Sequence, residues 1–334
     1  MTEPVANVAE AEDRFLEGEP PGYVRVESVR DIAEEIRLIR LVAQDREELP
    51  CWEPGAHIDL VLASGRVRSY SLCSDPDDRS HYEIAVLREP KSSGGSMEIF
   101  ASDLVGHVLG YIAPRNHFEL VDAPAYLLLG GGIGVAPLMP MMRELDRRGA
   151  AWRVLYAGRR PSSMAFLDDV AAYGEAHATI LFEDEVGRPD IAALFSSLVE
   201  GTVVYCCGPR GMIAAAEAAS WRIGTRNLHL ERFHPTIVPA SVLSFGGAFD
   251  VRLARSELTV HVPSDKSVLA AVRELLPGVP SSCGSGSCGV CETRVLAGGI
   301  EHRDRVLSAA ECERGDSMMI CVSRATDGLL VLDL

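Results

Sequence analysis

Four cysteines near the C-terminus constrain this sequence more than any other feature. Cys283, Cys288 and Cys291 are separated by four and then two residues, and Cys321 follows after 29 more. The spacing C-x4-C-x2-C…C is typical of the loop that binds a plant-type [2Fe–2S] cluster, because three thiolates must converge on one small inorganic core from a single tight loop.

The glycines between these cysteines support the same interpretation. Gly284, Gly286 and Gly289 allow positive φ, and we expect them to bring backbone N–H groups close to the cluster sulfurs. The alternatives are a disulfide pair or a zinc site. Zinc sites favour paired C-x2-C knuckles, and the sequence contains one such pair. We therefore predict a [2Fe–2S] cluster with four ligands: Cys283, Cys288, Cys291 and Cys321.

Length and composition are those of an ordinary globular protein. The 334 residues suffice for two or three domains, and a hydrophobic content of 47% supports packed cores. No apolar run is long enough to span a bilayer and no secretory signal opens the chain, so we expect a soluble, cytoplasmic protein without a membrane partner. Nine cysteines in such a protein indicate metal binding and free thiols.

The charge of the chain excludes one class of partner. A formal net charge of −16 argues against nucleic acid and fits an electron carrier that docks on a more basic surface. Acidic residues are concentrated before Pro20-Pro21, and we predict a disordered acidic leader over residues 1–21.

Residues 22–121 show short runs of alternating apolar and polar residues, separated by turn clusters. We expect strands over residues 23–29, 36–41, 57–62, 68–72 and 84–87. Short strands at this spacing predict a small antiparallel β-barrel.

Two motifs in this barrel favour a flavin. Arg68, Ser69, Tyr70 and Ser71 form an R-x-Y-S stretch on a strand and its exit. Alone it is a weak signal, since a strand with an exposed arginine has the same pattern. In a chain with an iron–sulfur motif, Tyr70 is placed to flank the isoalloxazine and Arg68 to pair with the phosphate.

The second motif is a strand followed by a Gly-Gly-Ser turn that opens a predicted helix. A flexible loop tip is the alternative interpretation, but such a turn can hold a phosphate on its backbone N–H groups. We predict the turn at Gly94, Gly95 and Ser96 as the phosphate site. The preceding residues Ala85, Val86 and Leu87 would offer backbone groups to the ring edge.

Residues 122–233 change to a βαβ pattern, which predicts a doubly wound α/β domain with its ligand at the strand C-termini. A buried strand over residues 126–129 leads into a glycine-rich turn that departs from strict G-x-G-x-x-G spacing. A Cys-Gly-Pro sequence at a second strand end strengthens the prediction. The predicted nucleotide-binding residues of the two turns are Gly131, Gly132, Gly134, Cys207, Gly208 and Pro209.

We interpret residues 234–247 as a linker and residues 248–334 as an α+β unit of the plant-type ferredoxin class. Its expected elements are a hairpin over 249–262, a helix over 267–276, a strand over 293–296 and a closing strand over 329–334. We place Cys321 in a strand over 318–322, and we expect Cys312 to be a thiol outside the cluster.

This order of barrel, nucleotide domain and C-terminal ferredoxin resembles the phthalate dioxygenase reductase family. Its members, which include vanillate demethylase reductases, are the reductase components of two-component Rieske oxygenases. The resemblance covers nearly everything from Gly22 onward, and its most specific stretches are residues 68–73, 114–118, 206–209, 301–304 and 329–334. The sequence departs from the family at Leu87 and Ala136, where relatives often have lysine and threonine.

The resemblance implies three cofactors and a partner. FMN rather than FAD would be bound by the R-x-Y-S stretch and the Gly-Gly-Ser turn, with Ala136 and Phe233 beside the flavin. NADH would bind at the glycine turn and at Cys207-Gly208-Pro209. The partner would be a terminal Rieske-type oxygenase, either an aromatic-acid dioxygenase or a demethylase, on which a monomer docks transiently.

The number of electrons that each cofactor transfers also explains why the nicotinamide, flavin and cluster sites occur together. NADH delivers two electrons as a hydride, a [2Fe–2S] cluster accepts one at a time, and flavin connects the two, so no catalytic acid or base is required. Three alternatives stay open: a stand-alone flavin reductase, the reductase of another monooxygenase system, and a non-enzymatic iron–sulfur sensor.

Two features of the sequence point to different nicotinamide nucleotides. The stretch after the second strand of the nucleotide domain contains Arg159 and Arg160 and no acid. Local chemistry favours NADPH, because an arginine there can hold a 2′-phosphate. The family resemblance favours NADH, since a guanidinium can also stack on adenine or reach the pyrophosphate. We predict NADH, with both arginines in the nucleotide site.

Overall fold

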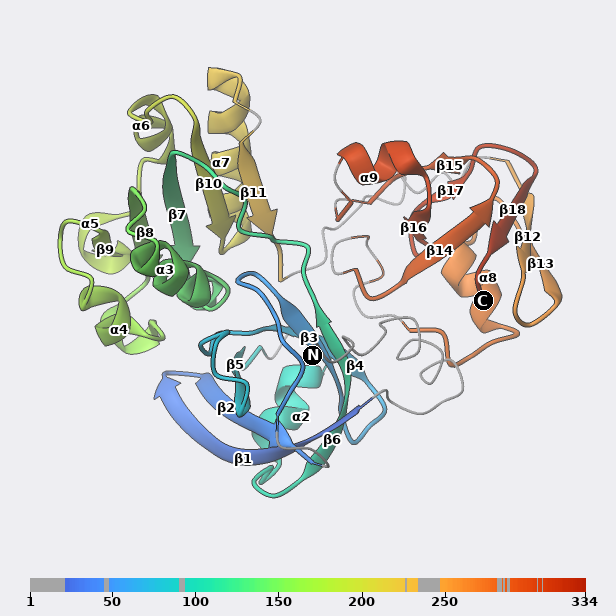
Figure 1. Ribbon diagram of the computed structural model, residues 1–334, viewed down its shortest axis with the longest axis horizontal. Coiled ribbons are helices and arrows are strands. Elements are labelled where there is room, and N and C mark those ends of the chain that lie inside the picture. Colours follow the sequence, from blue (N-terminus) through green and yellow to red (C-terminus); the bar gives the residue numbers. More distant parts are fainter. Residues whose placement is uncertain are drawn as a thin grey trace, which may run out of the picture. The chain divides into compact units, whose positions relative to one another are not determined.

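The computed structural model describes most of the chain (Figure 1). The described residues are 22–44, 48–89, 94–225, 227–233, 247–280, 284, 286, 289–304, 306–307 and 309–334. The predicted leader and all but the last residue of the predicted linker lie outside them. None of the described helices is both long and apolar enough to cross a membrane.

The N-terminal sheet has six strands, which confirms the predicted barrel. They are β1 (Gly22–Ala33), β2 (Ile36–Ala43), β3 (His57–Val61), β4 (Val67–Ser71), β5 (His81–Leu87) and β6 (Val108–Arg115). Their order is β4-β3-β6-β1-β2-β5, and the pairs β1–β2, β1–β6, β2–β5 and β3–β6 are antiparallel. A bridge between Leu72 and Ile84 joins the two ends of this order, so the sheet curls on itself. The short helix α2 (Gly95–Ala101) follows β5.

The second sheet is parallel and confirms the predicted doubly wound domain. Its strands are β7 (Ala125–Gly131), β8 (Trp152–Gly158), β9 (Ala178–Phe182), β10 (Thr202–Cys207) and β11 (Leu228–Glu231), in the order β11-β10-β7-β8-β9. The helices are α3 (Leu138–Arg147), α4 (Leu167–Ala171), α5 (Glu183–Val186), α6 (Ile191–Ser196) and α7 (Arg210–Ile223), with short 3-10 turns η1 (Gly132–Val135) and η2 (Pro161–Ser163).

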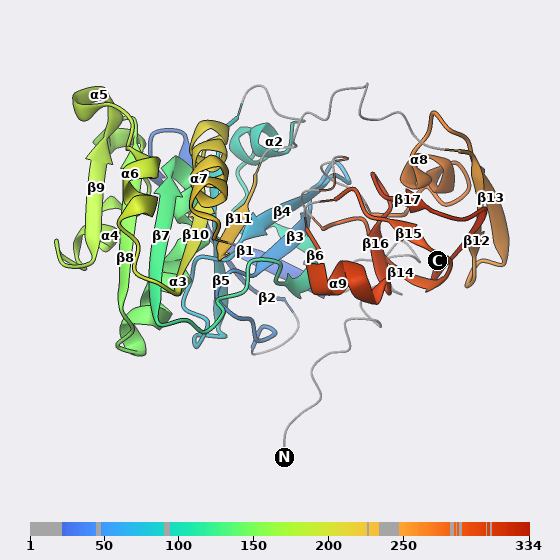
Figure 2. The same cartoon turned by 90° about the horizontal axis from the view of Figure 1, so that it is seen from above.

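Helices cover both faces of the parallel sheet (Figures 1 and 2), and the side chains of β7 point alternately to one face and to the other. Leu128 of β7 belongs to the apolar cluster that contains α3 and Val170 of α4. Leu127 and Leu129 belong to a separate cluster that contains α6 and α7. Successive side chains of a strand point to opposite faces, so a strand buried on both sides must be apolar throughout.

Several elements were not predicted from the sequence, among them α5, β6, α7 and β11. β6 contains Gly110 and Pro114, which weaken the strand pattern, and β11 has four residues. Strand β11 matters most, because it places Glu231 level with Cys207 of β10.

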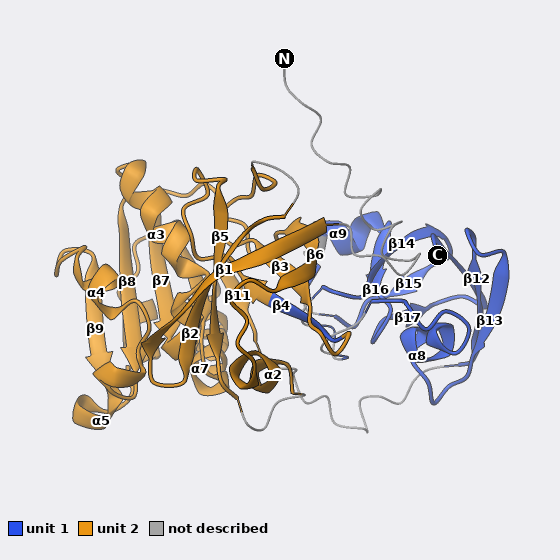
Figure 3. Cartoon of the chain, turned by 90° about the horizontal axis from the view of Figure 1, so that it is seen from below, with its two compact units in different colours: residues 1–21, 66–69, 234–334 blue, residues 22–65, 70–233 orange. Residues whose placement is uncertain are grey.

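Helix α3 ties the barrel to the parallel sheet. One apolar cluster contains Leu138 and Met142 of α3 together with Leu38 and Ala85 of the barrel. The guanidinium of Arg143 adds hydrogen bonds to the carbonyls of Cys73 and Ser74, at 2.7 and 2.9 Å. Accordingly, the two sheets lie in one compact unit, Gly22–Gly65 with Tyr70–Phe233, apart from residues 67–69 of β4 (Figure 3).

The other compact unit contains Arg66–Ser69 and His234–Leu334. Its main sheet has the order β13-β12-β18-β14-β16, and β15 (Ile300–Glu301) pairs with β17 (Arg324–Ala325). The strands of the main sheet are β12 (Phe249–Leu253), β13 (Leu258–Val262), β14 (Glu292–Ala297), β16 (Ser317–Met319) and β18 (Leu329–Leu332). The helices are α8 (Val268–Arg273), which Ser267 caps, and α9 (Ala309–Arg314).

The placement of Cys321 in a strand was wrong. Strand β16 ends at Met319, and Cys321 lies in the turn that follows. The N–H groups of Val322 and Ser323 both donate to the Met319 carbonyl, at 3.1 and 3.0 Å, which closes the turn. An apolar run predicts a strand, but here these local hydrogen bonds end it before the cysteine. The boundaries drawn between the domains stay a prediction.

Candidate functional site

The cluster loop has the backbone that its glycines predicted. Gly284, Gly286 and Gly289 have φ of 63°, 66° and 75°, which confirms the expectation of positive φ. Two of the four cysteines, Cys283 and Cys288, lie outside the described residues. The described part of the loop is therefore built on conformations that residues with a Cβ adopt at a cost.

The other two cysteines are buried, and each accepts a hydrogen bond from a backbone N–H group. Cys291 and Cys321 are each 5% exposed, and the Ile320 N–H donates to the Cys291 carbonyl at 3.3 Å. The N–H of Gly286 donates to Sγ of Cys321 at 3.3 Å. A thiolate that accepts such a bond has part of its negative charge offset, as cluster ligands require.

Gly286 occupies a place that no larger residue fits. A Cβ there would lie 2.5 Å from Cγ2 of Val322 and 3.0 Å from Cα of Asp304. The Asp304 carboxylate in turn accepts from the N–H groups of Val306 and Leu307 and from the hydroxyl of Ser323. The tight packing around Gly286 and a donor set of four thiols fit a [2Fe–2S] cluster.

Cys312 is the remaining thiol of this unit. It lies on α9, half-buried, and burial raises the pKa of its thiol. The hydrogen bond from the Gly286 N–H of the cluster loop to Sγ of Cys321 favours Cys321 over Cys312 as the fourth ligand.

The predicted flavin residues Arg68, Ser69, Tyr70 and Ser71 follow one another along β4. Nη1 of Arg68 donates to the Val67 carbonyl at 2.6 Å. Tyr70 is half-buried and packs against the barrel core. Successive side chains of a strand point to opposite faces of the sheet, so neighbouring residues of the motif lie on different faces of the barrel wall.

The edge of β5 and the turn before α2 are the other predicted flavin contacts. Ala85 and Leu87 pack with the α3 cluster, whereas Val86 belongs to the barrel core. Gly94 has φ of 94° and α2 begins at Gly95, which confirms the predicted turn into a helix. The hydroxyl of Ser96 accepts from the Glu89 N–H at 3.1 Å and holds the turn against the end of β5.

The two glycine-containing turns predicted for the nucleotide lie directly against each other. A Cβ on Gly131 would lie 2.4 Å from Cδ of Pro209, and one on Gly134 would lie 2.2 Å from the Cys207 carbonyl oxygen. Gly208 also lies close to Gly131, since a Cβ on Gly208 would lie 3.0 Å from the Gly131 Cα. Glycine is thus required for turn-to-turn packing at these positions. Gly132 has φ of 54° and open space beside it.

Glu231, which the sequence analysis did not select, lies where the flavin and nucleotide motifs meet. Its carboxyl oxygens accept from the Ser71 hydroxyl at 3.2 and 3.3 Å, and its side chain hydrogen-bonds the Cys207 thiol. Burial raises the pKa of Glu231 to about 8, against the lowering effect of these two hydrogen bonds. The carboxyl is therefore mainly protonated at neutral pH.

A signal for Glu231 does exist in the sequence. The residue follows two leucines at alternate positions, Leu228 and Leu230, and precedes Phe233 by two positions, and a carboxyl group in such a partly apolar stretch is a candidate functional group. Phe233 is 41% exposed, and Arg232 pairs with Glu217 at 2.6 Å. Ala136, by contrast, is buried in the α3 cluster.

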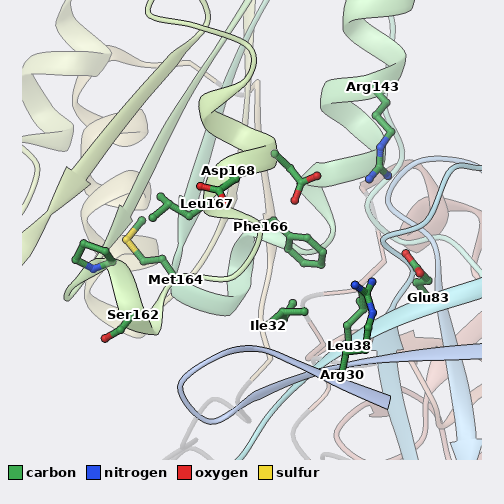
Figure 4. A pocket seen from close by; sticks show the side chains of 12 residues that line it. Arg30, Ile32, Leu38, Glu83, Arg143, Ser162, Met164, Phe166, Leu167 and Asp168 are labelled. Atoms are coloured by element: carbon green, nitrogen blue, oxygen red, sulfur yellow. The ribbon is translucent and has the colours of Figure 1, made fainter. Parts of the chain in front are cut away.

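The segment after β8 contacts the barrel. The Arg160 guanidinium lies 2.5 Å from the carboxylate of Glu34, a second residue that was not selected. A cavity of about 510 Å³ opens beside this contact, between the β1–β2 hairpin and the residues that lead into α4. Figure 4 shows Arg30, Arg143 and Phe166 among the side chains around it.

Comparison with a family model supports the cluster assignment. Residues 251–326 match the 2Fe-2S iron–sulfur cluster binding domain. The matched range contains all four predicted ligands.

Known proteins are similar to the whole chain. Phenoxybenzoate dioxygenase subunit beta from Ectopseudomonas oleovorans is 41% identical over 94% of this chain and 98% of its own length. The solved phthalate dioxygenase reductase, described as a modular structure for electron transfer from pyridine nucleotides to [2Fe-2S], is 33% identical with a TM-score of 0.67. The match extends over 93% of this chain and 97% of the phthalate dioxygenase reductase chain.

A longer protein is similar as well. An intact type IV self-sufficient cytochrome P450 monooxygenase is 37% identical with a TM-score of 0.86 and covers 100% of this chain. The chain spans 43% of the length of that protein.

Proposed function

Because this chain belongs to the phthalate dioxygenase reductase family, we propose that it transfers electrons from NADH through FMN and a [2Fe–2S] cluster to a Rieske-type oxygenase. The chain is an oxidoreductase, the reductase component of an oxygenase system. The observation that carries the proposal is that Ser71 and Cys207 both hydrogen-bond to the carboxyl group of Glu231. A residue predicted for the flavin and one predicted for the nucleotide share one hydrogen-bonding partner.

Flavin, when bound, accepts the hydride of a nicotinamide and releases electrons singly, which matches a one-electron cluster. The protein supplies position and electrostatics. Arg68, Ser69, Tyr70 and Ser71 of β4 would hold the flavin, and Ala136 and Phe233 would approach it from the nucleotide domain. A protonated Glu231 adds no negative charge beside the ring.

The edge of β5 and the turn before α2 complete the flavin site. Ala85, Val86 and Leu87 offer backbone groups, and the turn from Gly94 to Ser96 binds a single phosphate. The family and this Gly-Gly-Ser turn together favour FMN over FAD.

The nucleotide site lies at the C-terminal ends of the parallel strands. Its residues are Gly131, Gly132, Gly134, Arg159, Arg160, Cys207, Gly208 and Pro209. Gly132 has the open backbone that a pyrophosphate can approach, whereas Gly131 and Gly134 let the two turns pack together.

Released cofactor and acceptor specificity test the proposal. Chromatography of the heat-released flavin is expected to give FMN alone, and a stoichiometric yield of FAD contradicts that choice. With NADH, the loaded protein is expected to reduce a Rieske-type oxygenase and to lose this activity when the cluster is removed. Equal reduction of the oxygenase after cluster removal contradicts the electron path.

A second candidate partner is a haem oxygenase. The observation that favours it is the match of this chain over its whole length to 43% of the self-sufficient P450, with a TM-score of 0.86. Anaerobic reduction rates with a purified Rieske oxygenase and a purified P450 distinguish the two.

We further propose that the chain works in the cytoplasm as a monomer. Nine cysteines, four of them in the cluster motif, suit a reducing compartment. Native mass spectrometry of the loaded protein tests the monomeric state.

A further inference from the structure

A polar contact joins the turn between β1 and β2 to the segment that follows β8. The Glu34 carboxylate lies 2.5 Å from Nη2 of Arg160 and accepts from the Ser162 hydroxyl at 2.8 Å. The Glu34 N–H also donates to the Ser162 carbonyl at 2.7 Å. We call these three bonds the Glu34 latch.

The latch lies where nucleotide choice is made in doubly wound domains. The end of the second strand meets the adenosine ribose, where an acid accepts from the 2′-hydroxyl and an arginine holds a 2′-phosphate. The residues after β8, 159–163, contain two arginines and no acid. Glu34 brings a carboxylate to this place from 126 positions away in the sequence.

The carboxylate changes what Arg160 can bind. Its guanidinium is already engaged by a negative charge, so a 2′-phosphate would have to displace Glu34 or accept its repulsion. Arg160 and Glu34 are both about half exposed, and such a pair contributes little to folding stability. The bonds to Ser162 nevertheless fix the carboxylate in position, which is what selectivity requires.

We propose that Glu34, a barrel residue, determines the choice of NADH over NADPH by occupying Arg160. The inference rests on the proposed function, because it takes the adenosine end of the nucleotide to lie along the segment after β8. Glu34 acts through Arg160, so it positions a charge and takes no part in hydride transfer.

The same turn offers a matched control. Glu35 follows Glu34 directly, but its carboxylate pairs at 3.4 Å with Arg88 of the barrel. Glu34→Gln and Glu35→Gln each remove one negative charge from the turn, and only the first releases Arg160.

The experiment uses the full chain with its flavin and cluster. Calorimetry measures the dissociation constants of ADP-ribose and 2′-phospho-ADP-ribose, which are redox-inert. Steady-state kinetics measures kcat and KM with NADH and with NADPH.

Glu34→Gln is expected to shift the ratio of the two dissociation constants toward the 2′-phosphate by about tenfold, or about 1.4 kcal/mol. The ratio of KM values should shift in the same direction, without a matching change in kcat. Glu35→Gln should shift either ratio by less than about twofold, as expected for one screened surface charge. Adding Arg160→Ala to Glu34→Gln should remove the gain.

An unshifted ratio in Glu34→Gln, an equal shift in Glu35→Gln, or a gain that survives Arg160→Ala overturns the inference. A wild type that prefers NADPH overturns the proposed choice of NADH and this inference with it. A wild type that prefers NADH, combined with an unshifted variant, overturns the inference alone.

Discussion

The Ser71 hydroxyl donates to the Glu231 carboxyl group at 3.2 Å, although 160 positions separate the two residues in the sequence. Ser71 ends β4 of the barrel, and Glu231 ends β11 of the parallel sheet. The bond therefore links the two sheets beside Cys207. Burial raises the pKa of this carboxyl group, which lies between a residue predicted for the flavin and one predicted for the nucleotide.

Replacing Glu231 by glutamine should flatten the dependence of stability on pH. The pKa of Glu231 rises from its ordinary 4.5 to about 8 on folding, because the carboxyl is buried. Between these values the folded protein keeps a proton that the unfolded chain releases, so the free energy of unfolding falls as pH rises. The total fall is on the order of a few kcal/mol.

Thermal melting of the loaded protein from pH 5 to pH 9 measures this effect. The wild type should lose stability more steeply than Glu231→Gln across the range. Glu175→Gln, at an exposed position, should follow the wild type. Parallel curves for the wild type and Glu231→Gln would show that the carboxyl ionises normally.

Serine at Cys291 or Cys321 should remove the stable cluster and leave the flavin bound. Both cysteines are buried at the loop, whereas Cys312 lies on α9. The visible spectrum should lose its iron–sulfur bands and keep its flavin bands, and NADH-to-ferricyanide activity should largely survive. Cys312→Ser is the control, and loss of the cluster in that variant alone would identify Cys312 as the fourth ligand.

Alanine at Gly286 should destabilise the cluster more than alanine at Gly284. Both glycines have φ near 65°, so each substitution costs about 1–2 kcal/mol of backbone strain. A Cβ at Gly286 also meets Val322 and Asp304, whereas one at Gly284 has no described atom within 4 Å. Iron content after purification and the rate of bleaching in air measure the difference. Equal losses would assign the effect to backbone strain alone.

Alanine at Gly134 should destabilise the nucleotide domain by about 1–3 kcal/mol through overpacking. Its Cβ would lie 2.2 Å from the Cys207 carbonyl oxygen and force the two turns apart. The KM for NADH should rise along with the loss of Tm. Gly149→Ala, with φ of 60° and open surroundings, is the control for stability. A Tm equal to that of the wild type would mean that the turns can separate without cost.

The sequence determined those features that depend on neighbouring residues. The spacing of Cys283, Cys288 and Cys291 identifies a cluster loop because three ligands must reach one core from one turn. Positive φ at Gly286 and the helix start after Gly94 follow from the same local logic. Alternating and continuous apolar runs likewise predicted the barrel and the parallel sheet.

Tertiary structure decided where distant residues meet. Glu231 contacts Ser71 because β11 is the edge strand next to β10, and Glu34 contacts Arg160 because α3 packs the barrel against the parallel sheet. The local arginines alone favoured NADPH, and only the folded chain brings a carboxylate to Arg160. Spacing along a chain specifies turns and periodicity, whereas contacts across more than a hundred residues depend on how separate apolar faces pack together.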